Sequence, residues 1–330
     1  MRLDSVRELK QRAMTDIVSP MRAAAPRSIN LAFAAAPMEV TKTKPRLVAL
    51  GIAPAGRNQY KLAIRLQWHS LEEAPEVERL VRLARHEVDV RYIGQVRKRA
   101  VNFRAKHRPL IIGCSVAHMK VTAGTLGGFV KRRKGDDTCI LSNNHVLADE
   151  NNAQRGDAIL QPGPYDKGKS GDAVAKLADF VPLRLRRRNH VDSAIAVVSS
   201  SIDCDVEKIP GIGVLKGVFP DTIEDGLQVR KAGRTTGVTR GRVSAFEVDD
   251  VVVEYDLGNV RFDDQIEIEG SGSGPFSDGG DSGSLIVDSR RFAVAQLFAG
   301  TDLGGRNGMG LTYATPIQAV LDSLKVDLLY

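Results

Sequence analysis

The sequence predicts a mainly β protein, in which an antiparallel β-domain follows a small α+β module. Two observations predict the β-domain. Beyond residue 108 the chain becomes a series of short apolar runs separated by Gly-rich turns, and helical periodicity is almost absent until Pro316. Recurring short strands of this kind are typical of a closed or sandwiched antiparallel sheet. The 330 residues, 42% of them hydrophobic, suffice for two domains, which we place at 1–108 and 109–330.

The first domain is predicted to contain a helix, a linker and the α+β module. Residues 1–20 favour an amphipathic helix ended by Pro20, and about the next twenty residues, rich in Ala and Pro, favour a linker. Ser70 and Glu73 form a capping box before a helix that runs to about Arg85. Strands are predicted on either side of that helix, over Leu47–Ile52, Tyr60–Leu66 and Val88–Tyr92. No motif in this module carries chemistry.

The β-domain follows a basic connector, residues 97–108, and ends in a helix, Ile317–Leu324. Its clearest strand candidates are eight short apolar runs: Gly127–Val130, Cys139–Ser142, Ala158–Gln161, Ala194–Val198, Val251–Tyr255, Gln265–Ile268, Ser284–Val287 and Phe292–Phe298.

Charge and cysteine content limit the classes of function that we expect of the chain. Residues 1–110 hold 22 basic and 10 acidic side chains, against 25 and 30 in the rest of the chain. This basic region could meet nucleic acid, an anionic membrane or an acidic protein, but a solvated surface is the default interpretation. It lacks interleaved aromatic residues and a helix-turn-helix pattern, so nucleic-acid binding is not expected. Three cysteines without metal-ligand spacing favour a reducing compartment, and no apolar run predicts a membrane span.

The segment Gly279–Ser284 most clearly implies chemistry. Ser282 is preceded by Gly-Asp and followed by Gly, so it can sit on a tight turn where the N–H groups of residues 280 and 282 converge beside its hydroxyl. Two such donors are what an oxyanion hole requires. Gly, Asp and Ser are also ordinary turn formers, so a polar turn residue is the alternative interpretation of Ser282.

A serine nucleophile needs a base, and His145 is the candidate among the six histidines. It follows an apolar strand pattern, where the imidazole would stand at the strand terminus; a satisfied histidine at a strand end is the alternative. Asp192 is the candidate to orient the imidazole. It opens the apolar strand Ala194–Val198, where a carboxylate without a partner would be costly.

The order His145, Asp192, Ser282 resembles the trypsin/chymotrypsin-like serine protease family. Four segments carry the resemblance: Thr125–Val130, Asn144–Val146, Val191–Ala196 and Gly280–Ser284. A fifth, Gly233–Val243, is similar to a hairpin of the second barrel in bacterial streptogrisin-like and α-lytic-like members. The resemblance covers roughly residues 111–325. The N-terminal module has only a vaguer likeness to extensions of intracellular trypsin-like proteins.

The resemblance implies two six-stranded antiparallel β-barrels of the chymotrypsin-like type. It also implies that Ser282 is the nucleophile, His145 the general base and acid, and Asp192 the residue that orients His145. The N–H groups of Gly280 and Ser282 would form the oxyanion hole. Substrate would lie along Leu297, Phe298, Ala299 and Gly300, and Phe276 would form the floor of the specificity pocket, which implies no preference for basic side chains although Asp278 is close by. No metal or cofactor is implied.

Two departures from the family pattern matter. The disulfides of secreted members are missing, which fits a cytoplasmic member better. Asp281 would pair in that family with a freshly cleaved N-terminus, for which Ile111–Ile112 is the candidate, but Pro109 disfavours cleavage there. Asp281 therefore has no evident partner in the sequence.

The function we expect is that of an intracellular serine endopeptidase acting on a protein or peptide substrate through a Ser-His-Asp triad and an acyl-enzyme. Residues 1–108 would form a regulatory or recruiting module that binds a protein partner, and oligomers are compatible with this expectation. The alternative is a latent or inactive protein of the protease fold that binds peptides or acts as a scaffold.

Overall fold

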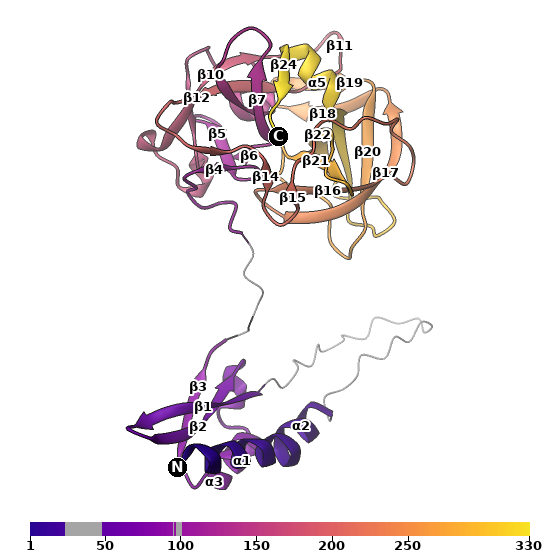
Figure 1. Ribbon diagram of the computed structural model, residues 1–330. Helices are drawn as coiled ribbons and strands as arrows, with labels where there is room; N and C mark the ends of the chain where they lie inside the picture. The colour runs from indigo at the N-terminus through magenta and orange to yellow at the C-terminus, as the bar shows by residue number, and fades with distance from the viewer. Residues whose placement is uncertain (24–47, 95, 97–100) are drawn as a thin grey trace. The chain divides into compact units, whose positions relative to one another are not determined.

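The computed structural model describes residues 1–23, 48–94, 96 and 101–330 (Figure 1). The chain forms two compact units, Met1–Arg99 and Ala100–Tyr330. Most of the predicted linker and the first residues of the basic connector lie outside the described residues. Phe103 is buried in the core of the second unit. In the described part of the chain, no helix is long and apolar enough to cross a membrane.

The first unit has the predicted strand, strand, helix, strand order. Strand β1 (Val48–Gly56) pairs antiparallel with β2 (Gln59–Leu66), and β2 pairs parallel with β3 (Val88–Tyr92) after helix α3 (Pro75–Leu83). The N-terminal helix is α1 (Leu3–Ala13), which continues through a π-helical segment, Met14–Val18, into α2 (Ser19–Ala23). Apolar residues of all these elements form one core.

Two details of this unit differ from the prediction. The N-terminal helix does not end at Pro20, because the chain passes through the π-helical turn Met14–Val18 and stays helical to Ala23. Wider turns of this kind are a recognised way for a helix to depart from its regular hydrogen bonding. The capping box of Ser70 and Glu73 is not formed. Ser70 lies in a 3-10 turn, His69–Leu71, and α3 begins with Pro75 after Ala74, without a side-chain cap.

The second unit contains an eight-stranded sheet with the order β24-β7-β8-β12-β10-β9-β5-β6. All pairs within it are antiparallel. The C-terminal strand lies at one edge, beside β7. The strands are β5 (Ser115–His118), β6 (Gly124–Thr125), β7 (Gly128–Arg132), β8 (Thr138–Ser142), β9 (Ala158–Leu160), β10 (Ala173–Phe180), β12 (Ala194–Val198) and β24 (Val326–Leu328).

The same unit contains a closed six-stranded barrel with the order β16-β17-β20-β23-β22-β21. In Figure 1 its orange and yellow strands lie beside the purple sheet. Its strands are β16 (Gln228–Gly233), β17 (Gly237–Val248), β20 (Gln265–Gly270), β21 (Leu285–Asp288), β22 (Ala293–Gly300) and β23 (Leu311–Pro316). The predicted mainly β fold is confirmed, with the second of the two predicted six-stranded barrels closed. Its first half is the eight-stranded sheet, to which the chain's last strand is added.

Shorter elements complete the unit. A third sheet has the order β11-β19-β18, and its strands β18 and β19 form a hairpin. Helix α5 contacts β22 and β23, and its apolar side joins the core that the eight-stranded sheet shares with the barrel. These elements are α4 (Asn144–Leu147), α5 (Ile317–Leu324), β4 (Leu110–Ile111), β11 (Arg188–Asn189), β13 (Cys204–Asp205), β14 (Lys208–Ile209), β15 (Gly213–Val214), β18 (Val251–Tyr255) and β19 (Gly258–Phe262).

Candidate active site

His145 and Asp192 lie on neighbouring strand ends of the eight-stranded sheet. His145 is in the single turn of α4, directly after β8, and Asp192 precedes β12 by two residues. Because β8 and β12 pair with Ser142 opposite Ala194, the sheet register brings the two side chains together. His145 Nδ1 lies 2.5 Å from Asp192 Oδ2.

The Asp192 carboxylate is fully buried and surrounded by donors. Its Oδ1 accepts hydrogen bonds from the N–H groups of Asn144 at 2.7 Å and His145 at 3.4 Å, and its Oδ2 accepts one from the hydroxyl of Tyr255 at 2.7 Å. Burial lowers the pKa of His145, but the charge of Asp192, its hydrogen bond and the charge of Glu150 together raise that pKa above its ordinary value. The pair therefore makes the imidazole more basic than an ordinary histidine.

Ser282 lies in the loop between β20 and β21. Strand β6 contacts both this loop and the residue after His145: Thr125 N donates to Ser282 O at 2.8 Å, and Gly124 lies so close to Val146 that a Cβ would overlap the valine side chain. The Ser282 hydroxyl donates to Phe298 O at 3.4 Å. In the described structure it makes no hydrogen bond to His145.

The turn around Ser282 has two unused donors. The N–H groups of Gly280 and Ser282 have no acceptor among the described residues, whereas their neighbours Asp281 and Gly283 donate to Asp278 O and Leu297 O. Gly280 has φ +91°, and a Cβ there would come within 2.8 Å of Arg234 Nη1 and Thr235 Oγ1. Only glycine suits this position, and its conformation exposes donors that an oxyanion could use.

Asp281 has a partner that the sequence did not reveal. Lys231, on β16, lies inside the barrel with no exposed surface, and its Nζ is 3.2 Å from Asp281 Oδ2. Burial lowers the pKa of Lys231, and Asp281 partly offsets that effect. The buried ammonium group of Lys231 thus pairs with Asp281, and this pair needs no cleaved N-terminus.

Backbone and hydroxyl donors complete the shell around Asp281. Its Oδ1 accepts from the N–H groups of Thr235 at 2.7 Å and Thr236 at 3.2 Å, and its Oδ2 accepts from Thr236 Oγ1 at 2.7 Å. At Gly233 a Cβ would lie 2.5 Å from Asp281 Oδ1, so the glycine permits this approach. Arg234 forms a buried bidentate pair with Asp166, at 2.7 Å for both bonds, and no hydrogen bond to Asp281 in the described structure.

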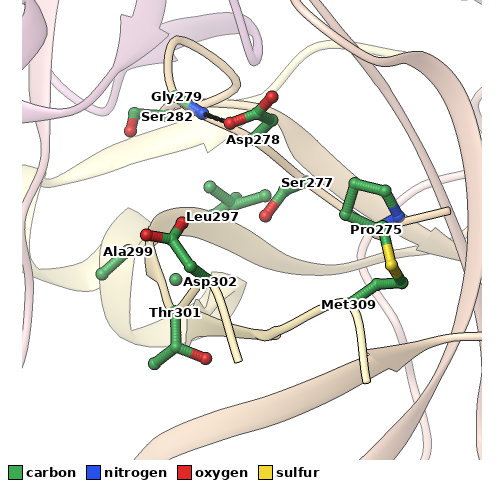
Figure 2. Close-up of a pocket in the computed structure, with 11 residues that line it drawn as sticks. Pro275, Ser277, Asp278, Gly279, Ser282, Leu297, Ala299, Thr301, Asp302 and Met309 are labelled. Carbon is green, nitrogen blue, oxygen red and sulfur yellow. Dashed lines mark hydrogen bonds between the residues drawn. The ribbon is translucent and has the colours of Figure 1, made fainter. Parts of the chain in front are cut away.

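A pocket of about 460 Å³ opens beside Ser282. In Figure 2 Ser282, Gly279 and Asp278 lie on one side of it, and Thr301 and Asp302 on the other. Its lining residues are Pro275, Ser277, Asp278, Gly279, Ser282, Leu297, Ala299, Gly300, Thr301, Asp302 and Met309.

The lining matches part of the expected substrate site. Leu297, Ala299 and Gly300 line the pocket, and Phe298 lies beside it with its carbonyl accepting from Ser282. Phe276 is not among these lining residues. Its ring is 2% exposed and packs in the barrel core with Val229 and Val243. A side chain entering the pocket would meet the carboxylates of Asp278 and Asp302.

Sequence reasoning missed two residues that contact the candidate site, Lys231 and Tyr255. Strand alternation could have indicated the first, since Lys231 is two residues after the buried Val229 and therefore faces the barrel interior. Tyr255 likewise shares a strand face with Val251 and Val253, but no local signal ties it to a carboxylate 63 residues away.

Comparisons with solved structures find bacterial serine proteases of the trypsin/chymotrypsin-like type. Nocardiopsis protease (NAPase) is 18% identical, with 67% of this chain and 98% of that chain covered at a TM-score of 0.48. Thermobifida fusca protease A is 17% identical, with coverage of 66% and 97% and a TM-score of 0.45. Cellulomonas bogoriensis chymotrypsin is 14% identical, with coverage of 66% and 97% and a TM-score of 0.45. No protein-family model and no curated protein matches the chain. At these identities and TM-scores the similarity says nothing about activity.

Proposed function

We propose that this chain is a serine endopeptidase in which Ser282 attacks the peptide carbonyl and His145, oriented by Asp192, transfers the proton. The observation that carries the proposal is the 2.5 Å contact between His145 Nδ1 and the buried Asp192 carboxylate. A carboxylate in this position selects the tautomer with Nδ1 protonated, which leaves Nε2 free to accept a proton.

The proposed reaction uses side chains and backbone groups of this chain and one water molecule. Nε2 of His145 takes the Ser282 proton as Oγ bonds to the carbonyl carbon, and the resulting oxyanion accepts hydrogen bonds from the N–H groups of Gly280 and Ser282. The imidazolium then protonates the leaving amine, and an acyl-enzyme forms. Water activated by the same imidazole hydrolyses that ester and restores Ser282.

One observation favours the alternative of a latent, peptide-binding protein. The Ser282 hydroxyl donates to Phe298 O and not to His145. Catalytic hydrogen bonds are often long or misaligned before substrate binds, so rotation about the Ser282 side chain is part of the proposed mechanism. A latent protein would bind peptides along β22 without cleaving them.

We also propose that the protein acts in the cytoplasm. All three cysteines, Cys114, Cys139 and Cys204, are free thiols, as expected of a protein from the cytoplasm. The first unit has its own helices, sheet and core, which supports a separate role in regulation or in recruiting a protein partner.

Covalent labelling tests the proposed nucleophile. Incubation of the full chain with a fluorophosphonate probe is expected to add one probe per chain, on Ser282, because the proposed mechanism gives that hydroxyl a base and two oxyanion donors. Peptide mapping by mass spectrometry gives the modified residue. Peptide binding without an adduct would support the latent protein, and an adduct on another serine would contradict the assignment.

The pH dependence of kcat/KM is expected to follow His145. Neutral imidazole is the active form, so activity should be lost as pH falls through a pKa that the Asp192 carboxylate holds above 6.5. The measurement is a pH profile between about pH 5 and pH 9 with an uncharged peptide substrate. A midpoint below 6.5 would contradict the geometry of the His145–Asp192 pair.

A further inference from the structure

Tyr255 contacts the His145–Asp192 pair from an element distant in the chain. It is the last residue of β18, and its hydroxyl donates to Asp192 Oδ2 at 2.7 Å, the oxygen that also faces His145 Nδ1. Its ring lies 5.7 Å from the imidazole, centroid to centroid. Burial and the neighbouring Asp192 raise the pKa of Tyr255 well above its usual value, so the hydroxyl keeps its proton and acts as a donor.

The hydroxyl completes the hydrogen bonding of a carboxylate that has no access to water. Asp192 Oδ1 is held by two backbone N–H groups, those of Asn144 and His145. Oδ2 is held by two side chains, His145 and Tyr255. Without the hydroxyl, Oδ2 would have only the imidazole as a donor in the described structure. Leaving a buried charged oxygen underbonded is unfavourable.

The β18–β19 hairpin holds Tyr255 in place from two sides. At its tip, the N–H groups of Asp256 and Leu257 donate to the Glu150 carboxylate at 3.2 and 2.9 Å. Glu150 follows the helix that carries His145 by three residues.

On the other side, the hairpin packs against β22, the strand along which substrate is expected to lie. Tyr255 contacts the ring of Phe262, which in turn lies 4.8 Å from the ring of Phe298 on β22. The hairpin therefore joins the loop after α4, the helix of His145, to β22, and Tyr255 lies between them.

We propose that Tyr255 is a positioning residue whose hydroxyl fixes the Asp192 carboxylate, and through it the tautomer and orientation of His145. Its effect on turnover rests on the proposed peptidase function. Its effect on His145 does not, because the contacts exist whether or not the chain cleaves peptides.

Removal of the Tyr255 hydroxyl is expected to change the pKa of His145 in a direction that the surrounding charges determine. The titratable and charged groups that face His145 are Asp192 from the start of β12, Glu150 from the loop after α4, and Tyr255 from β18. The tyrosine hydroxyl partly neutralises the Asp192 charge. Without it that charge acts more fully on the imidazolium, so the pKa of His145 rises.

The test is an NMR titration of His145 in the full chain, comparing wild type, Tyr255→Phe and Tyr313→Phe. Tyr313→Phe is the matched control, because Tyr313 packs in the same apolar cluster but its hydroxyl donates to Glu267, at 3.0 Å. Tyr255→Phe is expected to raise the pKa of His145 by about 0.5 or more, and Tyr313→Phe to leave it unchanged. Equal titration in all three proteins would overturn the proposal.

Kinetics separates this proposal from the proposed function. If the wild type cleaves peptides, Tyr255→Phe should lower kcat about tenfold, keep KM within about twofold and move the acidic limb to higher pH. An unchanged kcat and pH profile would refute the positioning role while leaving the peptidase in place. A wild type without activity or probe labelling would refute the peptidase, and the NMR titration would still decide the role of Tyr255.

Discussion

Replacement of Ser282 by alanine is expected to lower kcat for peptide hydrolysis by about a millionfold. In the proposed mechanism the hydroxyl supplies the attacking oxygen, and knocking out the nucleophile of a triad alone costs about as much as removing all three members. The fold should persist, because the one hydrogen bond of this hydroxyl in the described structure is a 3.4 Å contact to Phe298 O. The measurement is single-turnover and steady-state hydrolysis of a fluorogenic peptide, with thermal unfolding in parallel.

Ser273→Ala is the matched control, since Ser273 is an exposed serine in the same loop. It should retain wild-type kcat. Residual turnover in Ser282→Ala within about a hundredfold of wild type would exclude Ser282 as the nucleophile. It would direct attention to another hydroxyl near the pocket, such as Ser277.

Replacement of Lys231 by methionine is expected to destabilise the protein and to disorganise the loop Gly279–Ser284, which carries the proposed oxyanion donors. Methionine matches the length of the lysine but leaves the buried carboxylate of Asp281 without its ammonium partner. Breaking a buried pair on one side costs about 3–5 kcal/mol in free energy of unfolding. Because Asp281 lies in the chain between Gly280 and Ser282, whose N–H groups are the proposed oxyanion donors, kcat should fall about a hundredfold, the loss typical of a missing donor.

A double-mutant cycle isolates this pair. Asp281→Asn alone should also destabilise the protein, and the double variant should lose less free energy of unfolding than the two single variants combined. Lys216→Met, which changes an exposed lysine, serves as the control and should match wild type in urea unfolding and in kcat. Additive effects of Lys231→Met and Asp281→Asn would show that the two side chains do not stabilise each other.

Much of the fold could be predicted because its strands are short and apolar and because turns separate them. All eight predicted runs of the β-domain coincide with or overlap strands, and the final helix has the predicted bounds, Ile317–Leu324. The predictions of helix ends fail where two local sequence rules compete. Ser70 and Glu73 fit a capping box, yet Pro75 starts the helix; Pro20 fits a helix end, yet a new helical turn accommodates it.

The sequence by itself predicted which residues would carry chemistry. Ser282 after Gly-Asp and before Gly, His145 at the end of a strand and Asp192 before an apolar strand are local patterns that can be recognised without the fold. Reactive groups at such places need partners.

Only the tertiary structure decided what holds these groups. Barrel closure turned Phe276 into the core and placed Lys231 against Asp281, and the β18–β19 hairpin brought Tyr255 to Asp192. The physical reason is that these contacts join segments dozens of residues apart. Sheet register and barrel closure, which no short stretch of sequence encodes, set their distances.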